Sequence, residues 1–221
     1  MPVATHAADG LAEGLAALGV EGGTGAAEES RLRQYLALLV KWNRVYNLTA
    51  ITDSAQMITH HVLDSLAIAP HLDRLPETAP GARVLDVGSG AGLPGIPLAI
   101  VRPAWSLSLL DGNGKKTAFI TQAAAEIGLR NVTVVTARVE NWTGGPFDVI
   151  VSRAFSSLHD FVTATRPLLS ASGYWAAMKG VVPHDELREL PTDVECREVI
   201  RLQVPGLDAE RHLLLLKVKT E

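Results

Sequence analysis

The chain has 221 residues, of which 47% are hydrophobic and 20% are charged, and its net charge is −4 at pH 7. This composition is typical of a globular protein with one sizeable core and excludes a wholly disordered chain. The acidic excess excludes a uniformly basic surface, so a local patch must hold any nucleic acid.

The expected compartment is the cytoplasm, without a membrane partner. No apolar run reaches the ~18 residues that a membrane span needs, and the first residues lack the pattern of a secretory signal. The single cysteine, Cys196, allows neither an internal disulfide nor a cysteine-rich zinc site, which fits a reducing compartment.

Residues 1–75 predict a helical extension. Residues 28–47 predict a helix whose apolar positions recur at steps of three and four: Leu32, Tyr35, Leu36, Leu39, Trp42 and Tyr46. Residues 52–71 predict a second helix, begun by a capping box of Asp53 and Gln56. Within it we expect His61 to contact Asp64 one turn away, and no metal site. Two prolines and a glycine at residues 76–81 predict a linker.

Residues 76–221 predict an α/β domain. Short apolar runs alternate with helical patterns, which is typical of a parallel, doubly wound sheet. The expected strands are 82–87, 106–110, 132–135, 147–151 and 174–179, and the expected helices lie near 94–102, 114–127 and 158–169. Two further runs, 194–204 and 211–218, are too close in sequence for a crossover helix. They predict an antiparallel hairpin that completes a mostly parallel sheet of seven strands.

A glycine-rich segment, VLDVGSGAGLPGIPLAI, includes the first of these strands and the turn that follows it. In a doubly wound sheet this turn lies at the carboxyl edge, where ligands bind. A dinucleotide fingerprint requires glycine where Leu93 stands, and a nucleophile elbow requires glycine where Val87 stands. Neither motif therefore fits this segment. The pattern that it does contain is an acid, Asp86, followed by three alternate glycines at positions 88, 90 and 92.

This pattern resembles the first motif of S-adenosylmethionine-dependent methyltransferases. That cofactor carries a sulfonium and an ammonium but no phosphate, so an anionic Asp86 beside the loop favours it over a pyrophosphate. Asp111 lies 21 residues after Gly90, at the end of the second strand, which is near the spacing at which an acid accepts hydrogen bonds from ribose hydroxyls. Because NAD has the same ribose, Asp111 does not choose between the two cofactors.

A closer resemblance covers about residues 30–218. The chain is similar to the bacterial 16S rRNA guanosine-N7 methyltransferase family (the RsmG or GidB family). The matching segments are WNRVYNLT, HHVLDSL, DVGSGAGLPGIPLAI, KKTAFI, FDVIVSRAF, the KG at 179–180 and ERHLLLLK. The resemblance implies methyl transfer from S-adenosylmethionine to N7 of one guanosine in small-subunit rRNA. It also implies cofactor contacts at Gly88, Leu93, Val139, Glu140 and Arg153, where Leu93 packs on the cofactor and residues 139–140 meet the adenine.

The implied reaction needs no general base, because N7 of guanine has a lone pair and no proton. Positioning N7 against the methyl group is expected to supply most of the rate acceleration. Arg153, or Lys179 at the end of the fifth strand, is the candidate catalytic residue that donates a hydrogen bond to O6 of guanine. Alternative partners for Arg153 are Asp148 and Asp160.

Two pairs of basic residues are candidates for RNA binding. Lys115 and Lys116 are expected at a helix N-terminus, where the helix dipole disfavours cations and a phosphate partner would compensate. Lys41 and Arg44 lie on the first long helix. Its aromatic residues, Trp42 and Tyr46, are expected to pack in the core rather than to stack on bases.

Three other functions remain open at this point: a small-molecule methyltransferase, a nicotinamide dehydrogenase and a non-catalytic RNA-binding factor. Binding of S-adenosylmethionine or of NAD separates the methyltransferases from the dehydrogenase. Because no large exposed apolar stripe is evident, we expect a monomer.

Overall fold

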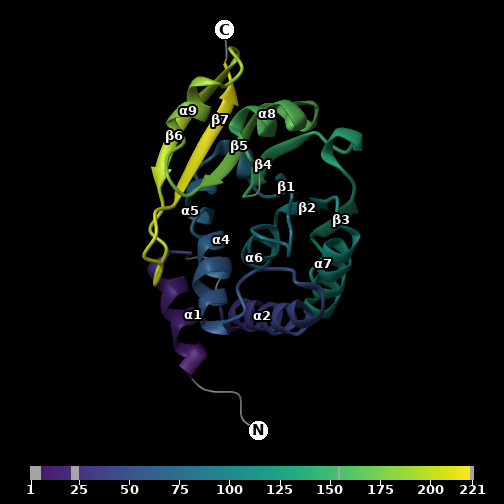
Figure 1. Ribbon diagram of the computed structural model, residues 1–221, viewed down its shortest axis with the longest axis vertical. Coiled ribbons are helices and arrows are strands. Elements are labelled where there is room, and N and C mark those ends of the chain that lie inside the picture. The colour runs from purple at the N-terminus through teal and green to yellow at the C-terminus, as the bar shows by residue number, and fades with distance from the viewer. Residues whose placement is uncertain (1–5, 21–24, 154, 220–221) are drawn as a thin grey trace.

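The computed structural model describes residues 6–20, 25–153 and 155–219 (Figure 1). The first five residues of the expected helical extension and the last two of the expected α/β domain therefore lie outside the described residues. Within the described residues, no helix is both long enough and apolar enough to cross a bilayer.

A seven-stranded sheet with strand order β3-β2-β1-β4-β5-β7-β6 forms the centre of the molecule. The strands are β1 (Arg83–Val87), β2 (Ser106–Asp111), β3 (Val132–Thr136), β4 (Phe147–Ser152), β5 (Leu169–Lys179), β6 (Val194–Arg201) and β7 (His212–Val218). The first five are parallel, while β7 pairs antiparallel with both β5 and β6. This arrangement confirms the predicted fold class and the C-terminal hairpin.

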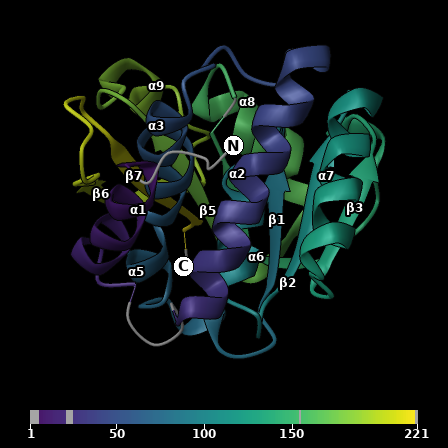
Figure 2. The same ribbon diagram turned by 90° about the horizontal axis from the view of Figure 1, so that it is seen from below.

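Helices cover both faces of the sheet, as Figures 1 and 2 show. On one face lie α1 (His6–Ala17), α2 (Ala26–Tyr46), α6 (Gly95–Val101) and α7 (Gly114–Ile127). On the other lie α8 (Leu158–Thr165) and the short α9 (His184–Arg188), which the sequence pattern did not predict. Successive strand residues alternate between the two cores: Val84 packs in the first and Leu85 in the second. Burial on both faces explains the near-continuous apolar runs.

The second predicted helix is wrong as a single helix. It consists of α3 (Ser54–Met57), a π-helix η1 (Ile58–Leu63) and α4 (Asp64–Leu66), and α5 (Ala69–Leu72) follows separately. Asp53 does cap its start, accepting a hydrogen bond from the Ala55 N–H at 3.2 Å. The wider π-turn changes which residues lie one turn apart. The expected contact of His61 with Asp64 is therefore wrong, because His61 Nε2 bonds the Thr49 hydroxyl at 2.9 Å instead.

The first long helix, α2, has the predicted extent but not all of the predicted buried face. Leu32, Tyr35 and Leu39 are buried, whereas Tyr46, the last residue of the helix, is exposed. The ring of Tyr46 still lies 5.2 Å from that of half-buried Trp42, centroid to centroid.

The expected linker at residues 76–81 begins with a packed 3-10 helix, η2 (Pro76–Thr78). The buried Thr78 hydroxyl donates to the Leu72 carbonyl at 2.7 Å, and its own carbonyl accepts from the Trp105 indole at 3.0 Å. The domain boundary at residue 75 stays a prediction. Two more 3-10 helices, η3 (Val139–Asn141) and η4 (Arg166–Leu168), follow β3 and α8.

Candidate functional site

The glycine-rich loop folds tightly over the carboxyl end of the sheet. Gly88, Gly90 and Gly92 have φ angles of 70°, 59° and 86°, a region that glycine enters at little cost. The N–H groups of Gly88 and Ser89 both donate to the Leu110 carbonyl, at 2.8 and 3.1 Å. The alternate glycines therefore let the backbone turn back onto the neighbouring strand β2.

Asp111 fixes this loop from the end of β2. Its Oδ2 accepts a hydrogen bond from the Gly90 N–H at 2.9 Å, and its Oδ1 accepts from the Asn113 N–H at 2.8 Å. A carboxylate oxygen can accept more than one hydrogen bond. Asp111 can therefore hold the loop and still accept further hydrogen bonds, and its contact with ribose hydroxyls stays a prediction.

A cleft of about 380 Å³ opens beside the loop. Gly88 and Asp111 line it from β1 and β2, and Val139 and Glu140 line it from η3. Phe155, from the segment after β4, contributes a further wall. The structure thus brings together four of the predicted cofactor residues around one cavity.

Two other predicted cofactor residues lie beneath the loop rather than in this cleft. Leu93 packs in the hydrophobic core. Asp86 is fully buried, its Oδ2 accepts from the Gly95 N–H at 2.8 Å, and its Oδ1 has no partner among the described residues. Burial raises the pKa of Asp86 to about 7, because desolvation penalises the charged form. Asp86 thus bonds the start of α6 beneath the loop and does not line this cleft, and its assignment to the cofactor stays a prediction.

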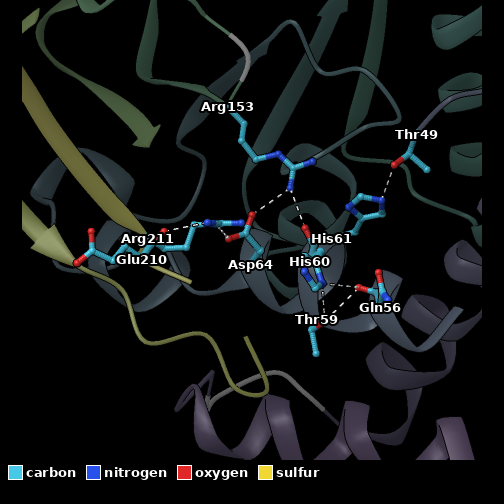
Figure 3. Close-up of polar contacts among 9 residues, drawn as sticks. All are labelled: Thr49, Gln56, Thr59, His60, His61, Asp64, Arg153, Glu210 and Arg211. Carbon is cyan, nitrogen blue, oxygen red and sulfur yellow. Dashed lines mark hydrogen bonds and ion pairs between the residues drawn. The ribbon is translucent and has the colours of Figure 1, made fainter. Parts of the chain in front are cut away.

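Arg153 follows β4 and points toward the N-terminal helices (Figure 3). Its Nη1 donates to the Asp64 Oδ2 at 3.1 Å and to the His60 carbonyl at 3.2 Å. Arg211, just before β7, donates from Nε to the Asp64 Oδ1 at 2.9 Å. Neither Asp148 nor Asp160 is the acid that pairs with Arg153, because the partner comes from a segment 89 residues earlier in the chain.

A second cavity of about 320 Å³ lies beside these arginines. Lys179 lines it together with Arg153, so the two candidate catalytic residues share one cavity. Lys179 Nζ pairs with Glu186 at 2.8 Å and reaches the Phe155 carbonyl at 3.4 Å. Asp64 and Arg211 were not predicted as site residues. HHVLDSL and ERHLLLLK did contain them, but the sequence gives no sign that the two segments meet.

The candidate RNA-binding residues lie on two neighbouring helices. Lys115 and Lys116 occupy the first turn of α7, whose cap Asn113 accepts from the Lys115 N–H at 2.9 Å. Lys41 and Arg44 are exposed on α2, which packs against α7 in part through Trp42 and Phe119, with ring centroids 5.6 Å apart.

Comparisons with known proteins identify the family and the fold. A family model described as rRNA small subunit methyltransferase G matches residues 28–214. A ribosomal RNA small subunit methyltransferase G from Laribacter hongkongensis is 54% identical over 210 residues, which is 95% of this chain and 97% of the relative.

Solved structures with the same fold are much less similar in sequence. A SAM-dependent methyltransferase from Aquifex aeolicus is 16% identical, with a TM-score of 0.55 over 76% of this chain and 99% of that one. A mutant of MtNAS in complex with S-adenosylmethionine is 14% identical, with a TM-score of 0.61 over 87% of this chain and 76% of that one. At such identities the likeness concerns the fold.

Proposed function

The chain belongs to the rRNA small subunit methyltransferase G family, and from that premise we propose that it transfers a methyl group from S-adenosylmethionine to N7 of one guanosine in 16S rRNA. The observation that carries the proposal is the 54% identity over 95% of the chain. It favours an rRNA methyltransferase over a small-molecule methyltransferase, a nicotinamide dehydrogenase or a non-catalytic RNA-binding factor.

The cleft beside the glycine loop fits this cofactor chemically. Asp111 supplies carboxylate oxygens for the ribose hydroxyls, and Val139 and Glu140 supply backbone and carboxylate groups for the adenine edge. The loop carries no phosphate-binding lysine, in keeping with a cofactor that has a sulfonium and an amino acid tail. Gly88 and Gly90 allow the backbone to approach that tail closely.

S-adenosylmethionine supplies an electrophilic methyl group when bound. In the proposed reaction the bond from the methyl carbon to sulfur would break as a bond from this carbon to N7 forms, and positive charge would move to the purine without a proton transfer. The protein must hold N7 in line with the breaking bond, which supplies several kcal/mol of the acceleration. Arg153 and Lys179 are the groups that we assign to O6 of the guanine, as hydrogen-bond donors.

The RNA must also be bound by residues outside this site. We assign phosphate contacts to Lys115 and Lys116 on α7 and to Lys41 and Arg44 on α2. Because the chain has a net charge of −4, this local patch must act against an acidic surface. We propose that the protein works as a monomer in the cytoplasm, where the small subunit is assembled, and without a membrane.

The test is methyl transfer from labelled S-adenosylmethionine to unmodified 16S rRNA and to small subunits that contain it. We expect label at one guanosine and chain cleavage there after borohydride and aniline treatment, which reports N7 methylation. Omitting the protein is the control. Label on another base, label in small molecules alone, or binding of NAD in place of S-adenosylmethionine would reject the proposal.

A further inference from the structure

We propose that the cavity beside Arg153, Arg211 and His61 receives the target guanine base, and that Asp64 is the positioning residue that holds both arginines at its wall. This inference rests on the proposed function and deepens it, because it names where the substrate base binds and which residues select it. None of the sequence patterns pointed to Asp64, His61 or Arg211 in this role.

The cavity has the composition that a purine base requires. Its volume is about 320 Å³, and its lining combines apolar side chains with hydrogen-bonding groups. Ile51, Met178 and Leu202 offer contact to the flat faces of a base, while Arg153, His61 and Arg211 offer polar contacts to its edge. Ligand pockets typically pair a mostly apolar wall with a few convergent polar groups.

Asp64 fixes the two arginines relative to each other. Its side chain is only 3% exposed, and each of its two oxygens accepts from a different arginine (Figure 3). The three residues come from α4, from the segment after β4 and from the approach to β7. A guanidinium has five N–H donors, and the contacts with Asp64 and His60 engage only Nη1 of Arg153. Both arginines keep about a quarter of their side chains exposed and can therefore reach a ligand.

His61 gives an independent indication of a ligand. The residue is 5% exposed and lines the cavity, and its Nδ1 is buried without a hydrogen-bond partner among the described residues. Its other ring nitrogen, Nε2, is fixed on the Thr49 hydroxyl at 2.9 Å. A buried nitrogen without a partner carries a desolvation cost, and a bound base that supplies the missing hydrogen bond relieves it.

These groups match guanine better than adenine. The arginines donate to an acceptor such as O6, and the neutral His61 ring accepts at Nδ1 from a donor such as N1–H when its Nε2 carries the proton. Adenine presents an amino donor in place of O6 and an unprotonated N1. With adenine bound, the arginine donors would face an amino donor, and His61 Nδ1, an acceptor, would face the acceptor N1. Unpaired polar groups of this kind strongly weaken the binding of the wrong base.

The cavity is also adjacent to the cofactor cleft. Arg153 lines the guanine cavity, while Phe155 and Ser156, two and three residues later, line the cleft beside the glycine loop. Lys179 connects the two sides, because it lines the guanine cavity and reaches the Phe155 carbonyl at 3.4 Å. A base in one cavity and a methyl donor in the other would therefore meet across the carboxyl ends of β4 and β5.

The first test measures single-turnover formation of 7-methylguanosine in 16S rRNA, together with the Kd for S-adenosylmethionine. Arg211→Gln, His61→Gln and Asp64→Asn should each lower the rate 10- to 100-fold and leave this Kd within twofold of wild type. Arg74→Gln is the matched control, because Arg74 forms an exposed pair with Glu198 and lines neither cavity. The double variant Asp64→Asn/Arg211→Gln removes one negative and one positive charge, so the net charge of the cluster is unchanged. It replaces Asp64→Asn in the test if that single variant does not fold. Its single-turnover rate should equal that of Arg211→Gln.

The second test needs no methyl transfer. Guanosine 5′-monophosphate is added to the ¹⁵N-histidine-labelled protein loaded with S-adenosylhomocysteine, and the His61 Nδ1 resonance is followed. It should shift with the guanosine nucleotide but not with adenosine 5′-monophosphate, and the shift should be absent in Arg211→Gln.

The outcomes separate the two proposals. If wild type methylates rRNA and the variants match its rate, the guanine pocket is wrong while the proposed function stands. If wild type modifies no guanosine but the nucleotide still shifts His61, the proposed function fails and the pocket stands. An unshifted His61 resonance together with unaffected variants rejects the pocket outright.

Discussion

Substitution of Asp111 by asparagine tests the link between the glycine loop and the cofactor. In the native protein both carboxylate oxygens accept backbone N–H groups, from Gly90 at 2.9 Å and from Asn113 at 2.8 Å. An asparagine side chain has one oxygen and one NH₂ group, so it can preserve only one of these bonds. Its amide hydrogens would face the other backbone N–H.

The magnitude follows from the bond that is lost. A hydrogen bond to a charged group contributes about 1.5–3 kcal/mol, and each kcal/mol lowers the melting temperature of a domain of this size by about 2–4 °C. We therefore expect Asp111→Asn to lower the melting temperature by roughly 5 °C without cofactor. The ribose would also lose a charge-assisted acceptor, which should weaken S-adenosylmethionine binding at least ~10-fold.

Isothermal titration calorimetry with S-adenosylmethionine and thermal melting monitored by circular dichroism check both numbers. The matched control is Asp148→Asn, because the Asp148 carboxylate also accepts a backbone N–H, from Arg83 at 2.8 Å, near the starts of β1 and β4. The control should bind the cofactor with wild-type affinity. A folded Asp111→Asn protein that binds as tightly as the control would refute the assignment of Asp111 to the ribose.

Three other substitutions probe buried polar groups through urea denaturation. Tyr35→Phe removes the buried hydrogen bond from the Tyr35 hydroxyl to the Ala91 carbonyl at 2.8 Å and should lower the unfolding free energy by about 1–2 kcal/mol; an unchanged midpoint would show that the bond contributes nothing. Burial lowers the pKa of His61 to about 4. The neutral ring therefore contributes up to about 3 kcal/mol to the free energy of unfolding above pH 6.5, and this contribution is lost as the pH falls toward 4. In His61→Gln this loss of stability between pH 7.5 and 4.5 should be absent. For Asp86 the pH dependence of the unfolding free energy has the opposite sign, because its pKa is raised to about 7: the stabilisation by the protonated carboxyl is present below pH 3.8 and is lost as the pH rises through 7. Asp86→Asn should therefore be more stable relative to wild type at pH 8 than at pH 4.5. An equal difference in unfolding free energy at both pH values would contradict the raised pKa.

The sheet was predictable because its signals are local. Apolar runs such as residues 147–151 are buried on both faces, so β4 was placed to within one residue. The capped start and the glycine end of α7 fixed residues 114–127 in the same way. The strand expected at residues 174–179 begins earlier, at Leu169, which pairs with Phe147 of β4. The sequence gave no apolar signal for this first part, because residues 170–172 are partly exposed and include two serines.

Residues of the proposed cofactor cleft could be predicted from the sequence, whereas only Arg153 and Lys179 could be predicted for the proposed guanine cavity, for a physical reason. Gly88 and Asp111 are placed by strand ends, and parallel strands all end at one edge of the sheet. Asp64 and Arg211 are 147 residues apart, on α4 and in the connection between β6 and β7, and their contact forms only in the folded chain. The π-turn also breaks the rule that residues three apart lie on one face, and the prediction for His61 failed on that rule.

The N-terminal helices contact residues of both proposed sites. Tyr35 on α2 donates to the Ala91 carbonyl in the middle of the glycine loop, and Asp64 on α4 holds Arg153 at the end of β4. The opposite side of α2 exposes Lys41 and Arg44, the residues assigned to RNA. Because these helices also share the main hydrophobic core with the sheet, the regions before and after residue 75 should unfold together.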